Sequence, residues 1–433
     1  MSERSVAAPL ASRGYAWTVF GLTFGLMLSD YLSRQVIGAV FPLLKSDWGV
    51  LDAQLGALVS VVSLVVGVFT IPLSLIADRW GRVRSITVMA FVWCLATVAC
   101  GLATNYWQLL AARAVVGLGE AAYAAAGAAL LAHTFAPERR AAVQGAFQSA
   151  GLFGSVLGVM IGGAVAAHLG WRAAFFAVGT PGFVLAAIYP FVVRDYVAPR
   201  LGGPSHATNA HGVALPAREV VTQVFRARSG NLTFLAFGLQ MAMPAILIAW
   251  TPTFLNRFYG FTPQKAALMA AVAVLAGGVG LLMGGGIADR LSRAHARYRA
   301  VVPASYALLS GIALAVGFAL PASAFALCLI VVGAVFAAAH GGCAIALVMD
   351  VTHPAVRTTV TATAVLGVSL LGFAPGPFFV GVVSDVTDLR TALMLAPLVS
   401  LLAAALFLLA SRCYERDVAS LALSDAHQSD ADR

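Results

Sequence analysis

Long apolar runs alternate with short polar segments from one end of the chain to the other. A helix needs about 20 predominantly apolar residues to cross the roughly 30 Å of hydrocarbon in a bilayer. The pattern therefore predicts an all-α membrane protein with twelve transmembrane helices. The first six are expected at about 14–44, 51–77, 84–104, 107–133, 139–167 and 171–193, and the second six at about 231–256, 263–288, 299–319, 322–350, 356–384 and 390–411.

Breaks in the apolar pattern divide the chain into four parts. Residues 1–193 are predicted to form an N-terminal six-helix bundle, and residues 231–411 a C-terminal one. The segment 194–230 is rich in arginine, glycine and histidine and is expected to be a cytoplasmic linker. Residues 412–433 turn acidic and polar and are expected to be a cytoplasmic tail that is partly disordered.

The two bundles repeat one another in sequence. Ala77-Asp78-Arg79-x-x-Arg82 recurs as Ala288-Asp289-Arg290-x-x-Arg293, and Pro137-x-x-Arg140 recurs as Pro354-x-x-Arg357. Because each half has an even number of helices, both halves enter the membrane from the same side. The repeats are then parallel and related by an axis along the membrane normal, and substrate sites in such folds lie between the halves near the midplane.

Composition and charge agree with this architecture and exclude several functions. Of all residues 60% are hydrophobic and 10% charged, whereas soluble domains carry about 25% charged residues. On the predicted topology, 20 of the 27 Lys and Arg residues lie on the side of both termini, five on the other side and two within helices. Positive residues favour the cytoplasmic side, so we expect a multi-pass membrane protein with both termini cytoplasmic. The short loops favour the inner membrane of a bacterium as its location. The net charge of +9 comes from these loops, and no basic face for nucleic acid is present.

Catalytic and metal-binding patterns are missing from the sequence. The five cysteines include no CxxC pair, and neither a metal-protease HExxH motif nor a nucleotide-binding GxxxxGK[ST] loop occurs. We therefore expect no cofactor, no metal and no enzymatic activity; a membrane-embedded enzyme is the alternative of another class.

Three signals resemble the major facilitator superfamily. Asp78-Arg79-Trp80-Gly81-Arg82 and its copy at Asp289 match the signature of that superfamily after helices 2 and 8. The pattern Arg113-x-x-x-Gly117-x-Gly119-Glu120 lies on helix 4, where the superfamily often carries an arginine. The resemblance covers essentially the whole chain and implies the major facilitator fold, in which helices 1 and 4 line the central cavity.

Within that superfamily the chain resembles the spinster-like group of lipid-type transporters. The motifs that carry this resemblance are Gly117-Leu118-Gly119-Glu120-Ala121-Ala122-Tyr123, Trp250-x-Pro252-x-Phe254-Leu255-x-Arg257 and Gly376-Pro377-x-x-x-Gly381-x-x-Ser384-Asp385. The family motif Asn-Tyr-x-Asp-Arg on helix 1 is here Asp30-Tyr31-Leu32-Ser33-Arg34, so the carboxylate has moved by about one helical turn. The resemblance implies a lysolipid-like cargo, and organic-anion symporters share part of the pattern.

Four charged residues within helices 1 and 4 are the candidates for coupling. Asp30 and Arg34 lie one turn apart on helix 1, and Arg113 and Glu120 lie two turns apart on helix 4. Charged residues inside membrane helices are costly and usually functional. An apolar site favours a protonated carboxyl group and a nearby arginine favours the ionised one, so Asp30 or Glu120 can take up and release a proton while Arg34 and Arg113 bind an anionic group. A static ion-pair network between the helices is the alternative.

Further polar and aromatic residues are predicted to contact the substrate. They are Tyr31, Tyr123, Gln148, Gln240, Trp250 and His340. For the glutamines and Tyr123 the alternative is a bond between helices, for Tyr31 and Trp250 ordinary packing, and for His340 a buried neutral ring bonded to a carbonyl group.

The repeated loop charges are predicted to form a gate. Salt bridges at the cytoplasmic helix ends would hold the inner gate shut in the outward-open state and break on switching. The residues of this predicted gate are Asp78, Arg79, Arg82, Arg140, Asp289, Arg293 and Arg357. The alternative is that these charges only set the topology.

Together these observations predict a proton-coupled secondary transporter of an anionic or amphiphilic organic solute, with alternating access. A proton-coupled symporter of small organic acids is the alternative. The expected partners are the solute, protons and the lipid bilayer, and we expect a monomer.

Overall fold

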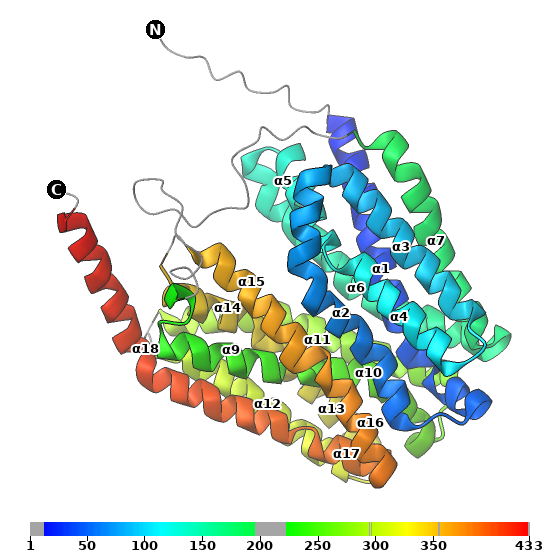
Figure 1. The fold of residues 1–433 in the computed structure, drawn as a ribbon. Coiled ribbons are helices and arrows are strands. Elements are labelled where there is room, and N and C mark those ends of the chain that lie inside the picture. The colour runs from blue at the N-terminus through cyan, green and yellow to red at the C-terminus, as the bar shows by residue number, and fades with distance from the viewer. Residues whose placement is uncertain (1–12, 195–221, 294, 296, 354–355, 432–433) are drawn as a thin grey trace.

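The computed structural model describes residues 13–194, 222–293, 295, 297–353 and 356–431, except for the side chains of 78, 79, 137, 141, 357, 358 and 422–431. The described chain is helical and contains no strand (Figure 1). Eleven of its helical stretches are long and apolar enough to cross a membrane. Helix α1 (Arg13–Trp48) is not among the eleven, but its 36 residues are more than a span requires.

The N half contains six helical stretches in the predicted places. After α1 come α2 (Asp52–Trp80), α3 (Arg82–Leu102), α4 (Tyr106–Glu120) with α5 (Tyr123–Thr134), α6 (Pro137–Leu169) and α7 (Trp171–Val192). Helix α1 packs along α6 and α7, and α3 packs along α4 and α7. The tight turn between α2 and α3 is made by Gly81, whose φ of 97° is accessible mainly to glycine.

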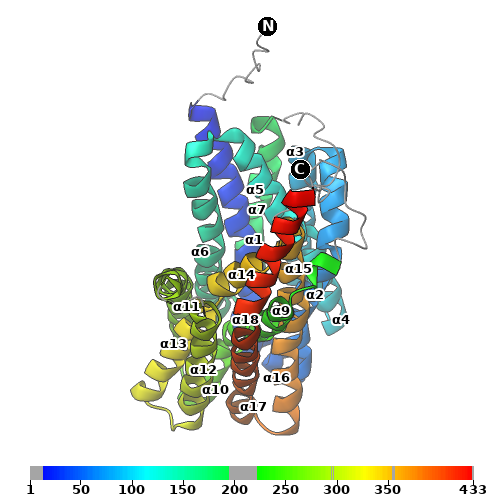
Figure 2. The same cartoon turned by 90° about the vertical axis from the view of Figure 1, so that its left-hand side faces the viewer.

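The C half repeats this arrangement. Its stretches are α9 (Arg228–Gln240) with α10 (Ala242–Tyr259), α11 (Pro263–Ser292), α12 (Tyr298–Ala319), α13 (Ala324–Ala339) with α14 (Gly341–Asp350), α15 (Arg357–Gly367) with η2 (Val368–Phe373) and α16 (Pro375–Val386), and α17 (Leu389–Leu395) with α18 (Leu398–Ala431). Helix α18 continues to Ala431, through most of the segment expected to be a cytoplasmic tail (Figure 2). Alanine and leucine, both strong helix formers, recur through this segment.

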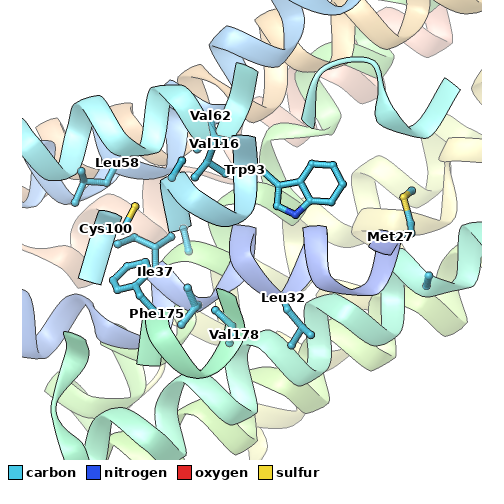
Figure 3. Packing of buried hydrophobic residues seen from close by; sticks show 14 of the residues in the cluster. Met27, Leu32, Ile37, Leu58, Val62, Trp93, Cys100, Val116, Phe175 and Val178 are labelled. Atoms are coloured by element: carbon cyan, nitrogen blue, oxygen red, sulfur yellow. The ribbon is translucent and has the colours of Figure 1, made fainter. Parts of the chain in front are cut away.

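The core of the N half surrounds the middle of α1. Figure 3 shows Met27, Leu32 and Ile37 of α1 among side chains from the neighbouring helices, including Trp93 of α3 and Phe175 of α7. A row of glycines on α6 lets α1 approach closely, since a Cβ at position 154, 158 or 162 would meet the α1 backbone or its side chains. The Gly154-x-x-x-Gly158-x-x-x-Gly162 spacing places these glycines on the face of α6 that packs against α1.

The two halves meet at one end and separate toward the other. Helix α6 packs along α11, α2 along α16 and α1 along α10. In Figure 1 the halves converge where α2 begins and diverge toward the end where α1 begins. We call the converging end, which includes Asp52, the Asp52 side, and the opposite end, which includes Arg13 and Val192, the terminal side.

Candidate functional site

Three of the four predicted charges form a cluster inside the N half. Asp30 and Glu120 are each only 6% exposed. Arg34 Nη2 donates a hydrogen bond to Ser63 Oγ (3.1 Å), and Arg34 Nε lies 3.9 Å from Glu120 Oε2. Glu120 is the last residue of α4, where the helix breaks before α5. The structure thus joins α1, α2 and α4 through this cluster, as predicted for helices 1 and 4.

The Asp30 and Glu120 carboxyl groups are both buried and close enough to interact electrostatically. Among the described residues, neither carboxylate oxygen of Glu120 accepts a hydrogen bond. Two neighbouring buried carboxyl groups disfavour the state in which both are ionised. The arrangement can therefore hold one proton between Asp30 and Glu120, and the nearby Arg34 guanidinium can compensate the remaining negative charge.

Arg113 is turned away from this cluster. Its Nε donates to the Leu58 carbonyl oxygen, its Nη1 to that of Ser33 and its Nη2 to that of Arg34, each at 3.1 Å. The side chain is fully buried. It therefore ties α4 to the backbones of α1 and α2, and in this conformation no substrate contact of Arg113 is visible.

A cavity of about 480 Å³ lies between the halves. It is lined by residues of α1, α6, α10, α11 and α13, and most of them are apolar or glycine. Of the predicted substrate-binding residues, Tyr31 and Gln148 are in its wall, together with Ser149 and Ser155. No charged side chain lines the cavity among the described residues. Tyr31 follows Asp30 in α1 and so connects the cavity wall to the charged cluster.

The remaining predicted substrate-binding residues lie outside this wall. Tyr123 is buried in the N half, where its hydroxyl donates to the Thr23 carbonyl oxygen (2.6 Å). Trp250 is buried beside Phe41 of the other half, with ring centroids 5.2 Å apart. Their contact with substrate remains a prediction that this conformation does not display.

Gln240 and His340 are buried in the C half. Gln240 is the last residue of α9, and neither of its amide atoms has a hydrogen-bond partner among the described residues. His340 separates α13 from α14, and its ring packs on Phe237 and Phe407. Neither ring nitrogen of His340 has a hydrogen-bond partner among the described residues, so the bond to a carbonyl group that was the alternative for this residue is not formed here.

A group of ionic contacts between the halves, on the Asp52 side, was not predicted. Asp52 at the start of α2 accepts two hydrogen bonds from the Arg257 guanidinium (2.7 and 2.8 Å) and one from Ser384 Oγ (2.6 Å). Lys45 Nζ donates to the same carboxylate at 2.6 Å from within the N half. The side chain of Asp52 is 3% exposed. We call Asp52, Arg257, Ser384 and Asp385 the Asp52 latch.

Asp385 completes the latch by binding the first turn of a helix in the other half. Its two carboxylate oxygens accept hydrogen bonds from the backbone N–H groups of Asp52 and Ala53, each at 2.8 Å. The N-terminus of a helix has free donors and a positive end of its dipole, so a carboxylate there is stabilising. The backbones of α2 and α16 also approach closely here, because a Cβ on Gly381 would collide with the Asp52 carbonyl group.

The predicted gating residues lie on the terminal side. The contacts of those whose side chains are described lie within their own halves. Arg82 donates to the Ala129 carbonyl oxygen (3.4 Å) and Arg140 to that of Phe135 (3.2 Å). Asp289 pairs with Arg299 at 2.6 Å, beside Arg293. The side chains of Asp78, Arg79 and Arg357 lie outside the described part of the structure. Salt bridges between the halves on the terminal side remain a prediction about the conformation in which the Asp52 side is open.

Comparison with known proteins gives a family match and a set of named transporters. A family model described as Major Facilitator Superfamily matches residues 23–374. A probable L-galactonate transporter of Escherichia coli (strain K12) is 26% identical over 63% of this chain and 62% of its own length, so the match spans less than two thirds of that relative. Protein spinster homolog 1 of Xenopus laevis is 24% identical over 95% of this chain and 84% of its own.

Solved structures share the fold. A crystal structure of a bacterial homolog to the human lysosomal transporter Spinster, in an inward-facing and unoccupied conformation, has a TM-score of 0.82. It is 22% identical and the similarity covers 94% of this chain and 99% of the other. The occupied inward-facing form of such a homolog has a TM-score of 0.81.

Proposed function

The chain belongs to the Major Facilitator Superfamily, and from this premise we propose that it is a secondary active transporter of an anionic or amphiphilic organic solute. The proposed cargo is lysolipid-like, the mechanism is alternating access, and the coupling ion is the proton. The observation that carries the proposal is the cavity between the halves, which is next to the buried Asp30–Glu120 pair and is closed by the Asp52 latch on one side.

The chemistry of the cavity wall supports the lipid-like cargo. A lysolipid has one long apolar chain, which the apolar wall formed by α10, α11 and α13 can cover. Gln148 and Tyr31 offer polar groups at one part of the wall, and Arg34, 20% exposed in its side chain, lies one turn beyond Tyr31 on α1. A compact pocket lined by arginines would instead suit a small organic acid.

Small organic acids are the second candidate because of the named relatives. The L-galactonate relative and a 4-hydroxybenzoate transporter of Pseudomonas aeruginosa, 28% identical over 66% of this chain, carry acids according to their names. Arg34 is the cation that such a cargo would meet.

In the proposed cycle the Asp30–Glu120 pair links a proton to the opening of the cavity. The pair holds a proton while it is shielded from water. Its proton affinity changes when the cavity opens and admits water, or when an anionic substrate draws Arg34 away. In the conformation described here the latch holds the Asp52 side shut, and the contacts of Arg82, Arg140 and Asp289 on the terminal side lie within their own halves. When the cavity opens on the Asp52 side, the residues Asp78, Arg82, Asp289 and Arg293 would close the terminal side.

The experiment that tests this proposal is uptake of labelled solutes into liposomes that contain the purified protein. Lysophospholipids and aromatic or sugar acids are compared, with and without an imposed pH gradient and with protein-free liposomes as the control. Uptake of lysophospholipid that rises with the gradient supports the proposal. Uptake of acids alone selects the second candidate, and uptake of neither class above the control contradicts both.

The gate on the terminal side has a separate test. Replacement Asp78→Asn should slow uptake strongly while membrane insertion stays normal, because one side of the predicted gate is lost. The matched control is Asp388→Asn, which removes the carboxylate of a helix cap on the Asp52 side. Equal uptake rates for wild type and Asp78→Asn would count against gating by this loop.

A further inference from the structure

A groove on the outer face of the N half is separate from the transport site. It lies between the first turns of α3 and the last turn of α7, on the terminal side, and has a volume of about 940 Å³. Arg84 and Arg194 are in its wall, with Trp80, Val88 and Pro190. The groove contains no residue of the cavity between the halves.

The described lining of this groove is positively charged. Its described lining contains two guanidinium groups and no carboxylate. Both arginines are exposed, and in the described part of the chain neither guanidinium has a hydrogen-bond or ion-pair partner. The backbone N–H of Arg194 donates to the Tyr15 hydroxyl (2.8 Å), which fixes the chain at the end of α7. Two planar guanidinium groups at one groove suit the oxygens of a phosphate.

Apart from Thr87, the other described lining residues of the groove have apolar or aromatic side chains. Val88 is 51% exposed and Trp80 is 63% exposed. The outward faces of the same two helices carry further exposed apolar side chains, such as Leu95 of α3 and Ile188 of α7. Tryptophan is enriched at the level of lipid headgroups, so Trp80 and the two arginines mark the headgroup level, and the apolar residues mark the level of the acyl chains.

We propose that this groove binds a phospholipid with an anionic headgroup, taken from the leaflet on the terminal side. The phosphate is held by Arg84 and Arg194, and the acyl chains lie along the outward faces of α3 and α7. Basic pockets between membrane helices bind anionic headgroups in this way. A zwitterionic lipid fits less well because its ammonium group adds a positive charge, and the described residues of the lining include no carboxylate to bind it.

Quenching of tryptophan fluorescence by brominated lipids tests this proposal. The full-length protein in detergent is titrated with brominated phosphatidylglycerol or brominated phosphatidylcholine, and the signal of Trp80 is the difference between wild type and Trp80→Phe. Phosphatidylglycerol is expected to quench Trp80 at lower concentration than phosphatidylcholine. In Arg84→Gln/Arg194→Gln its apparent affinity is expected to fall about 30-fold, since each arginine near an anionic lipid contributes about fivefold.

The matched control is Arg139→Gln/Arg290→Gln, which removes two exposed arginines elsewhere on the same side. Its phosphatidylglycerol affinity should equal that of wild type. The proposal is overturned if the Arg84/Arg194 variant binds phosphatidylglycerol as wild type does, or if both lipids quench Trp80 equally. It is also overturned if soluble glycerol phosphate displaces the brominated lipid at equal concentration, because the groove would then be a phosphate site without preference for lipid.

Discussion

The replacement Asp52→Asn should open the Asp52 side of the molecule. Two contacts of the Asp52 carboxylate cross between the halves, to Arg257 and to Ser384, and both must break when this side opens. The contact with Lys45 lies within the N half and persists in either conformation. Only the contacts that cross between the halves affect the equilibrium between the open and closed conformations, because a contact present in both conformations does not change their ratio.

The size of the effect follows from the burial of the partners. Loss of one partner of a buried ion pair costs about 3–5 kcal/mol. The side chain of Asp52 is 3% exposed but that of Arg257 is 27% exposed, so water partly compensates Arg257 and the cost is reduced. We expect a shift of about 2 kcal/mol, which is roughly a 30-fold change in the ratio of open to closed conformations.

Distances between spin labels measure this ratio. Labels at Leu102 and Ala322 report the separation of the halves, because both residues are exposed on the Asp52 side: Leu102 ends α3, and Ala322 lies in the turn between α12 and α13. Cys328 and Cys413 are replaced first, since they are the free cysteines that are not buried. Asp52→Asn should add a population with a longer distance, and Ser384→Ala should add a smaller one.

The matched control is Asp47→Asn. Asp47 lies on the same side and has the same charge, but it accepts hydrogen bonds from Trp171 and Arg172 of its own half. Its replacement should leave the distance distribution unchanged. If Asp52→Asn and Asp47→Asn give the same distribution, the latch does not hold this side shut and the reasoning is refuted.

Three further replacements separate structural from functional roles. Arg113→Lys should lower the free energy of unfolding by about 2 kcal/mol, because a lysine cannot keep all three carbonyl contacts; a melting midpoint in detergent equal to that of Arg139→Lys would contradict this. Tyr123→Phe loses one hydrogen bond to the Thr23 carbonyl group and should cost about 1 kcal/mol with unchanged uptake; a large loss of uptake would instead favour substrate contact. Ala273→Trp fills part of the cavity and should slow lysophospholipid uptake about tenfold more than uptake of 4-hydroxybenzoate; equal slowing would argue against a long apolar cargo.

The helices and the charged cluster were predictable because each has a strong local signal. Apolar runs of the length of a membrane span fixed the helices, and charges within such runs identified Asp30, Arg34 and Glu120 as neighbours on α1 and α4. The orientation of Arg113 was not predictable, since the same helix position can face the cluster or the backbones of α1 and α2. Its three carbonyl partners belong to segments 55 to 80 residues away in the chain.

The sequence also did not predict the direction in which the side chains of Gln240, Trp250 and His340 point from their helices. Their helices are apolar on all sides, so the sequence gives no preferred face. Glycine or proline accompanies each helix break: Pro244 lies four residues after Gln240, Gly341 and Gly342 follow His340, and Pro375 follows η2. The sequence did, by contrast, contain an indication of the Asp52 latch. Asp52 and Arg257 are opposite charges at helix ends on the same predicted side of the membrane.

Proton movement that accompanies solute transport tests the central claim most directly. Liposomes with a pH-sensitive dye inside contain wild type or Asp30→Asn, and lysophospholipids or organic acids are added outside without an imposed gradient. We predict that one class of solute produces a pH change with wild type and none with Asp30→Asn, because one proton site of the Asp30–Glu120 pair is lost. Solute uptake with wild type that produces no pH change, or a pH change of equal size with Asp30→Asn, would contradict the account.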